Sequence, residues 1–290
     1  MKNLALIFAA LVLIIRAFPI LPAHALISVA EKNARDAAAK RFVVVLDPGH
    51  GGIDHGTTFA GNPPVAEKDL TLMLARQVSA ELKSRGIEVI LTRDGDYEMP
   101  LAARTALANK VGADVFLSIH LNSTPGINPA LAQGVETYIL NHETDSTSKR
   151  LAQLENQVIG GVPNKEGEDV ALILKDLRLE ATLPESKRLA CLIQERVAKV
   201  NPQNTKSAHV VSVTSNRGVR QALFFVLLGA DMPSALIEAG FLSNSNDRAW
   251  LLTVAGQKSF GQAVARAIQV FRVQRNSPEA QRTLSSCKVH

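Results

Sequence analysis

The stretch FVVVLDPGHGG, residues 42–52, says most about the fold. Its first half, Phe42 to Asp47, is apolar and rich in β-branched residues, which is typical of a strand that is buried on both faces. Its second half places His50 among three glycines. Glycines permit a sharp turn. A histidine in such a turn, just past a buried strand, is therefore a candidate functional residue.

Strand and helix patterns alternate along the rest of the chain, with short connections between them. We expect strands at residues 87–93, 114–122, 134–140, 222–228 and 233–242, and helices at 67–86, 101–112, 185–200, 246–253 and 256–274. This alternation predicts an α/β fold, as a single domain with a mostly parallel twisted sheet covered by helices on both faces. Ligands bind at the carboxyl ends of the strands in such sheets.

The N-terminus has the layout of a secretory signal peptide. Lys2 precedes an apolar run at residues 4–15, and Ala23-His24-Ala25 forms a small-x-small cleavage site. An uncleaved anchor is the alternative, but a membrane span needs about 20 apolar residues. We therefore expect a signal peptide over residues 1–25, periplasmic localisation and no stable membrane anchor after cleavage.

The remaining chain divides into four parts. We expect a linker at 26–40, a catalytic domain at 41–274, an insertion at about 144–182 within that domain, and a tail at 275–290. Cys191 lies in a helical pattern and Cys287 in the polar tail. A disulfide would suit an oxidising compartment, but two distant cysteines do not make a disulfide framework, and we expect both to be unpaired.

The composition favours an anionic partner only weakly. The net charge is +5, but the basic residues are not clustered and aromatic residues make up 4% of the chain. Binding of single-stranded nucleic acid uses stacked aromatic side chains in a basic groove. We therefore expect no nucleic-acid partner.

Two histidines and a carboxylate are expected at one edge of the sheet. His50 follows the first strand, His120 ends the strand DVFLSIHLN, and Glu67 begins a helix after a glycine- and proline-rich loop. This set matches a catalytic zinc with an open fourth position. Histidine at a strand end is more often structural, and Glu67 could merely favour the positive end of its helix. Such ligands also serve other divalent metals.

Glu238 is a candidate for proton transfer. It is a lone acid inside the apolar stretch SALIEAGFLSN, where an unpaired charge would be costly to bury. A satisfied core carboxylate is the alternative interpretation.

The stretches LDPGHGGIDHG, EKDLTLMLARQVSAELKSRGIEVILTRDGD, LAARTALANKVGADVFLSIHLN and PSALIEAGFLSN resemble the zinc-dependent N-acetylmuramoyl-L-alanine amidases of the cell-separation type. The resemblance spans residues 41–272. It implies hydrolysis of the amide between the lactyl group of N-acetylmuramic acid and L-alanine in peptidoglycan. It also implies zinc ligands at His50, Glu67 and His120, a catalytic Glu238, and support or substrate contact by Arg104 and Asn122. We expect a monomer whose partner is peptidoglycan.

The resemblance also implies a role for the insertion. Family members that are activated by partner proteins carry a helix here that covers the site. We hypothesise that residues 144–182 are autoinhibitory, with Glu166, Glu168 and Asp169 as candidate regulatory acids and an activator protein that displaces the helix. An ordinary surface excursion is the alternative.

Two other functions compete with this interpretation. Ser146 and Lys149 fit the Ser-x-x-Lys pattern of penicillin-binding serine acyl-enzymes, but the companion Lys-Thr-Gly is absent. A wall-binding protein without catalysis is the other alternative. It is disfavoured because all four chemical positions, His50, Glu67, His120 and Glu238, are present.

Overall fold

The computed structural model describes residues 41–124, 132–141, 145–156, 168–200, 216–275, 287 and 289, with only the helical backbone at 168–180. The expected signal peptide and linker lie outside the described residues. None of the helices in the described ranges is long and apolar enough to cross a membrane.

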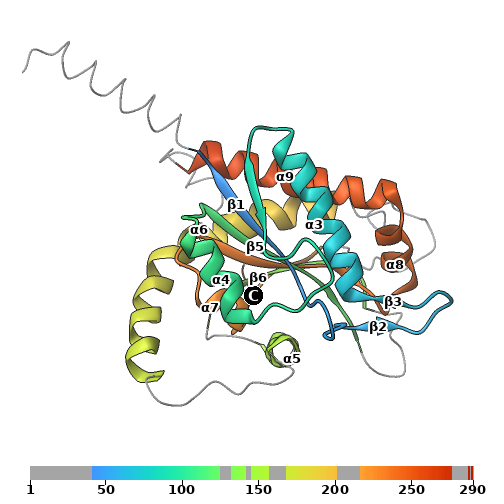
Figure 1. Ribbon diagram of the computed structural model, residues 1–290, viewed down its shortest axis with the longest axis horizontal. Helices are drawn as coiled ribbons and strands as arrows, with labels where there is room; N and C mark the ends of the chain where they lie inside the picture. The colour runs from blue at the N-terminus through green and yellow to red at the C-terminus, as the bar shows by residue number, and fades with distance from the viewer. Residues whose placement is uncertain are drawn as a thin grey trace, which may run out of the picture. The chain divides into compact units, whose positions relative to one another are not determined.

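A six-stranded sheet forms the centre of the domain (Figure 1). Its order is β4 (Glu88–Leu91), β1 (Val43–Pro48), β5 (Val115–Asn122), β8 (Ser234–Phe241), β6 (Val135–Leu140) and β7 (Asn216–Ala222). The strands β4, β1, β5 and β8 run parallel, β6 is antiparallel to β8, and β7 is parallel to β6. The first residues of β6 and β7 therefore share an edge with the last residues of β1, β5 and β8.

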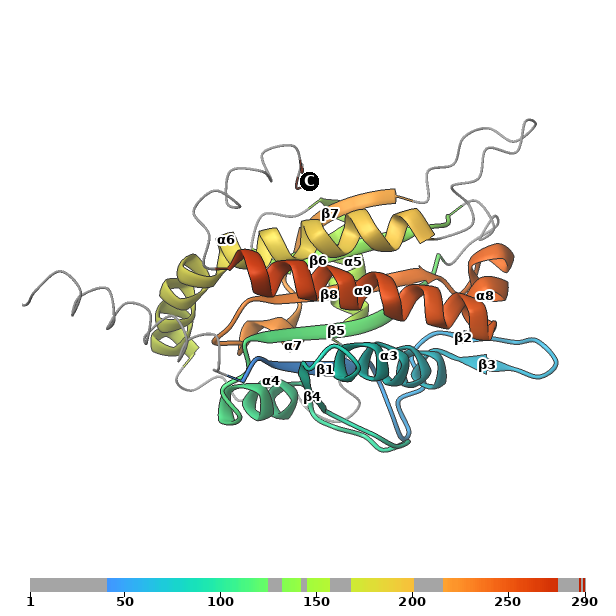
Figure 2. The ribbon, with the colours of Figure 1, turned by 90° about the horizontal axis from the view of Figure 1, so that it is seen from above.

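Helices cover both faces of this sheet. One face packs against α3 (Glu67–Lys83), α6 (Glu168–Val200) and α9 (Val254–Gln274), which lie alongside one another in Figure 2. The other face carries α4 (Leu101–Lys110), α5 (Ser146–Glu155) and α7 (Phe225–Leu228), while α8 (Ser245–Leu252) packs on α9 and β8. A two-stranded sheet of β2 (Thr58–Phe59) and β3 (Val65–Ala66) precedes α3. The expected α/β fold is confirmed.

The strand β1 is buried on both faces, as its composition predicts. Val44 and Leu46 face the core under α3 and α9, and Val43 and Val45 face the opposite core. In α3, the residues at helical spacing, Leu70, Leu74, Val78 and Leu82, are fully buried. Because β1 and α3 are both held in the core, they determine where the chain that joins them turns at the sheet edge.

The expected strand at 222–228 is wrong. The strand β7 is Asn216–Ala222, and Phe225–Leu228 is the short helix α7. A short apolar run cannot by periodicity be distinguished from a buried helix segment. An edge strand such as β7 pairs on one side only and tolerates charged residues, so its sequence NRGVRQA has no apolar run.

The insertion and the helix that follows it also differ from expectation. The helix α6 runs unbroken over 33 residues with Pro184 inside it, whereas the sequence predicts a helix that begins only at residue 185. Proline removes a backbone donor and usually ends or kinks a helix. The helix α6 packs against α9 and β6.

The expectation of unpaired cysteines is wrong. Cys191 on α6 forms a disulfide with Cys287, 96 residues further along the chain. Val289 then pairs with Val219 of the edge strand β7 in parallel. The tail is thus fastened to the sheet edge, which covers backbone groups that an open edge would expose. Nothing in the spacing of the two cysteines signals this contact.

We predict that the disulfide contributes measurably to stability. Closure of a loop this long restricts the unfolded chain, so Cys191→Ser with Cys287→Ser should lower the free energy of unfolding by about 2–5 kcal/mol in urea denaturation. A reductant should destabilise the wild-type protein and leave the double variant unchanged. Equal stability of the oxidised protein and the double variant would contradict this role.

Candidate metal centre and active site

The turn after β1 explains why a histidine stands among glycines. His50 has a φ of 62°, a conformation that is uncommon for residues other than glycine and that marks functional sites. A Cβ at Gly49 would lie 2.4 Å from the His120 ring. A Cβ at Gly56 would lie 2.6 Å from the His50 ring and 2.7 Å from the Glu67 carboxylate. Glycine is required at both positions because functional side chains pack directly on the backbone.

Glu67 is held at the first residue of α3. Its Oε2 accepts a hydrogen bond of 2.8 Å from the Thr57 amide, and its Oε1 accepts one of 2.8 Å from the Leu121 amide. The side chain is fully buried. The backbone next to His120 thus orients the carboxylate, which ties the helix start to the end of β5.

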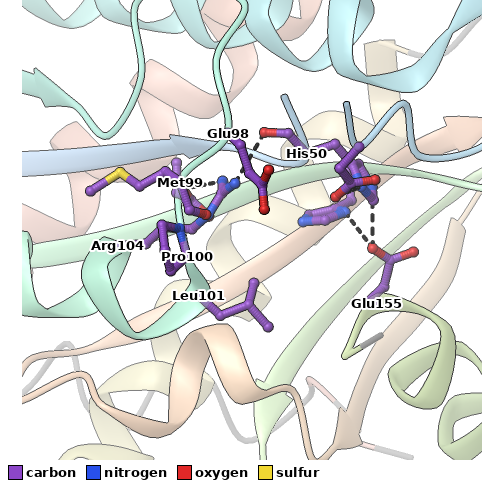
Figure 3. Close-up of a pocket in the computed structure, with 10 residues that line it drawn as sticks. His50, Glu98, Met99, Pro100, Leu101, Arg104 and Glu155 are labelled. Carbon is purple, nitrogen blue, oxygen red and sulfur yellow. Dashed lines mark hydrogen bonds and ion pairs between the residues drawn. The ribbon is translucent and has the colours of Figure 1, made fainter. Parts of the chain in front are cut away.

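Four side chains converge at this edge of the sheet. One ligand-type atom from each of His50, Glu67, His120 and Glu155 lies within 4.8 Å of the others. Glu67 Oε1 is 3.2 Å from His50 Nε2 and 3.3 Å from His120 Nδ1. Glu155 Oε2 is 3.3 Å from His50 Nε2 and 2.9 Å from His120 Nδ1 (Figure 3). The structure therefore brings together the three ligands expected from the sequence and adds a fourth.

The chemistry of this cluster fits a divalent cation. His50 Nε2, His120 Nδ1 and Glu155 Oε2 are buried, and among the described residues none of them has a partner in hydrogen-bond geometry. Two imidazoles and two carboxylates are a donor set that zinc binds in four-coordinate sites. Ligand-type atoms that face one another without hydrogen bonds are expected around a metal ion.

The electrostatics of the cluster agree with this interpretation. Burial alone would raise the pKa of Glu67, but the charge of His50 and contacts with both imidazoles lower it. Burial disfavours the charged form of His120, yet Glu155 outweighs this effect and raises the pKa of His120 to about 10. The pKa of His50 is also raised, since Glu67 and Asp54 outweigh burial. The buried carboxylates of the cluster are thus stabilised in their charged form by positive charge close to them.

Asp54 orients the first histidine. His50 Nδ1 contacts Asp54 Oδ2 at 2.9 Å, and Asp54 Oδ1 accepts a hydrogen bond of 3.0 Å from the Gly56 amide. A carboxylate on the far nitrogen of a ligating histidine fixes its tautomer and ring orientation. His50 Nε2 is thereby left to face the cluster.

Glu238 lies beside this cluster on β8, paired in register with His120 on β5 and with Glu136 on β6. The side chain is fully buried, and neither carboxylate oxygen has a hydrogen-bond partner among the described residues. Burial, followed by the charge of Glu155, raises the pKa of Glu238. An unsatisfied buried carboxylate is costly and points to a functional role.

Arg104 and Asn122 have structural partners here. Arg104 Nη1 donates to Asp47 Oδ1 at 2.8 Å, and Nη2 donates to the His50 carbonyl at 3.0 Å. Arg104 therefore supports the turn that carries His50. Asn122 Nδ2 donates to Glu136 Oε2 at 2.9 Å, which links the end of β5 to the start of β6.

Besides Asp54, three further residues of the site were not anticipated from the sequence. Glu155 ends α5, Glu136 lies in β6, and Arg217 lies in β7. Glu136 is a lone acid in the apolar strand GVETYIL, the same signal that identified Glu238. Arg217 Nε donates to Glu136 Oε1 at 2.6 Å, a contact between strands that are distant in sequence.

The structure does not describe the side chains of the other candidate acids of the insertion. Glu166 and the side chains of Glu168 and Asp169 lie outside the described residues. Among the described residues of the insertion, Glu155 is the acid at the cluster. Ser146 and Lys149 are exposed on α5, without the burial that would activate a lysine as a base.

Comparisons with known proteins identify the family of this chain. The sequence model described as N-acetylmuramoyl-L-alanine amidase matches residues 44–270. The amidase AmiC of Neisseria meningitidis is 34% identical over 81% of this chain and 54% of its own length. The amidase AmiA of Escherichia coli is 32% identical over 81% of this chain and 78% of its own length.

A solved structure supports the same relationship. The N-acetylmuramoyl-L-alanine amidase from Clostridium difficile 630 is 26% identical, with a TM-score of 0.58, over 82% of this chain and 98% of that one. The chain spans about half the length of the Neisseria relative. The match covers the sheet, its helices and every residue of the His50, Glu67 and His120 cluster, and the chain belongs to the N-acetylmuramoyl-L-alanine amidase family.

Proposed function

We propose that this chain hydrolyses the amide between the lactyl group of N-acetylmuramic acid and L-alanine of peptidoglycan stem peptides. The observation that carries this proposal is the His50, Glu67 and His120 cluster beside the buried, unsatisfied Glu238. Family membership supports the substrate. We place the activity in the periplasm, after removal of a signal peptide, in wall remodelling and daughter-cell separation.

His50, Glu67 and His120 would hold the metal, which we propose to be zinc. A bound zinc ion polarises a carbonyl oxygen and lowers the pKa of water. Asp54 keeps His50 in the tautomer that presents Nε2, and the Thr57 and Leu121 amides keep Glu67 in place. Glu238 accepts the proton of the attacking water at its carboxylate and donates it to the nitrogen of the leaving peptide.

We predict that Glu238→Gln abolishes turnover and leaves metal binding intact. Loss of a general acid and base costs about 10²–10⁴-fold in rate. Mass spectrometry of digested peptidoglycan should detect free stem peptides with the wild type and not with the variant, while metal analysis should find equal zinc in both. Glu195→Gln, at an exposed acid on α6, is the matched control. A Glu238→Gln variant as active as the wild type would contradict the mechanism.

We further infer that the insertion holds the site closed. Glu155 occupies the fourth position around the cluster, and catalytic zinc sites keep that position open for water. Two described contacts fasten the helix that carries it. Arg220 Nη1 pairs with Asp145 Oδ2 at 3.1 Å at one end of α5, and Asn156 Nδ2 donates to the Leu223 carbonyl at 2.8 Å at the other.

The apolar side of α5 adds to this attachment. Leu151 and Ala152 are buried in the core formed with α4 and α7. Withdrawal of α5 would expose these side chains to water, at a cost that a partner protein could offset by covering them. We therefore propose an activator protein that binds α5 and removes Glu155 from the cluster.

We predict that Glu155→Ala raises basal activity. Removal of Glu155, the fourth ligand-type side chain of the cluster, would leave a position at a bound metal open, so release of stem peptides without any partner should rise at least about tenfold, which corresponds to about 1.4 kcal/mol. Gln153→Ala, on the exposed side of the same helix, should leave the rate unchanged. A fall in activity of Glu155→Ala would show that Glu155 assists the reaction, and would overturn its inhibitory role.

A further inference from the structure

A second recess lies beside the metal centre, on the β6 and β7 side. One recess, of about 460 Å³, is lined by His50, Glu98 and Arg104 among others (Figure 3). The second, of about 450 Å³, lies under α5 and is lined by residues of β5, β6, β7 and β8 together with α5. Its charged lining residues are Glu136, Arg150 and Arg217. The first recess is lined by residues at the end of β1 and the start of α4, and the second by residues of β5 to β8 and α5.

The order of the strands indicates which part of the substrate each recess would hold. From β1 to β7, the sheet edge presents His50, His120, Glu238, Glu136 and Arg217 in that order. In the proposed reaction, Glu238 protonates the leaving nitrogen, so that nitrogen must lie within hydrogen-bond reach of Glu238. The peptide then continues towards β6 and β7, and the glycan lies on the β1 side. The second recess is therefore where the stem peptide would lie.

Arg217 is positioned to bind an anion in this recess. Its Nε is bound to Glu136 at 2.6 Å, and its guanidinium lies 5.0 Å from the centre of the Phe241 ring. A register shift in the pairing of β6 with β7 occurs at this residue, and such irregularities re-aim side chains. The structure records no acceptor among the described residues for the two terminal nitrogens of Arg217, and its side chain is 27% exposed.

Glu136 does not compete for these nitrogens, because its own oxygens are engaged. Its Oε2 accepts hydrogen bonds of 2.9 Å from both Asn122 and the Tyr138 hydroxyl. Its Oε1 contacts Arg217 Nε at 2.6 Å and Arg220 Nε at 3.3 Å. Arg220 also pairs with Asp145, and the charged residues that line the recess, Arg150, Arg217 and Glu136, together carry one net positive charge. A carboxylate suits the paired donors of a guanidinium.

We propose that Arg217 binds the α-carboxylate of the second residue of the stem peptide, the γ-linked D-glutamate, and so selects stems in which this group is free over stems in which it is amidated. The site rests on the proposed amidase function. The carboxylate nearest the scissile amide is the one that follows the leaving alanine into this recess. In the amide, an NH2 donor replaces one of the two acceptor oxygens and the negative charge is lost, so the amide would bind a guanidinium more weakly.

The test compares two substrates that differ in this group alone. The full-length protein is given two muramoyl tripeptides whose γ-carboxyl group is bonded to a third residue, N-acetylmuramoyl-L-alanyl-γ-D-glutamyl-L-lysinamide and its α-amidated (D-isoglutaminyl) counterpart, and kcat/KM is measured for each. We expect the acid to be preferred at least about tenfold, since hydrogen bonds to charged groups contribute about 1.5–3 kcal/mol. Because both substrates meet the same closed and open forms of α5, their ratio does not depend on the inhibition by Glu155.

Variants assign the preference to Arg217. Arg217→Gln should bring the ratio of acid to amide close to one, and Arg217→Lys should give an intermediate ratio. Glu136→Gln combined with Arg217→Gln removes the charge that the single variant leaves uncompensated, and should also give a ratio near one. Arg196→Gln, at an arginine on α6 whose side chain is 26% exposed, is the matched control and should retain the wild-type ratio.

A binding measurement tests the preference of this site in the absence of turnover. In the Glu238→Gln protein, the released tripeptide L-alanyl-γ-D-glutamyl-L-lysinamide should bind at least about tenfold more tightly than its α-amide in calorimetry, and Arg217→Gln should remove the difference. Hydrolysis of both substrates at equal rates by the wild type, or an unchanged preference in Arg217→Gln, would overturn the subsite alone. Hydrolysis of neither substrate, by the wild type or by Glu155→Ala, would overturn the proposed function.

Discussion

The burial of carboxylates along one sheet edge is the constraint on which this structure depends. Glu67, Glu136 and Glu238 are each at most 1% exposed, and a buried charge is costly unless it is paired or hydrogen-bonded. Backbone amides and imidazoles satisfy Glu67, and arginines, an amide and a phenol satisfy Glu136. Glu238 has no such partner among the described residues. Glu238, whose burial is costly, thus lies near two carboxylates that hydrogen bonds and ion pairs stabilise.

The sequence predicts the half of the site that follows local rules. A buried strand that ends in DPGHGG, a histidine at the end of β5 and an acid at the start of α3 can each be placed because parallel strands end at one edge. The strands β6 and β7 run in the opposite direction to β1, β5 and β8, so residues at the start of β6 and β7 lie at the same edge. The parallel pattern gives no reason to expect this of Glu136 and Arg217, and β7 itself lacks the apolar run by which strands are found.

The remaining features depend on long-range contacts. Glu155 ends an amphipathic helix like many others, and only the position of α5 over the sheet edge brings its carboxylate to His120. The pairing of Cys191 with Cys287 depends on the path of the tail after α9. Neither contact leaves a trace in local periodicity. The resemblance of the motifs to a family predicts a regulatory insertion with Glu166, Glu168 and Asp169 as its acids, whose side chains lie outside the described residues, whereas the described acid at the cluster is Glu155.

The strand β7 has a consequence for control of the enzyme. It carries Arg220, which pairs with the start of α5, and Arg217, which we propose receives the stem peptide. Residues of α5 form the outer wall of the same recess, and Glu155 of α5 lies against His120, so a stem peptide that extends from the recess to the cluster would require α5 to withdraw. By thermodynamic linkage, a ligand that binds only the open form shifts the protein towards that form. Dense peptidoglycan would then act as a weak activator, and a partner protein would need to supply only the remaining free energy.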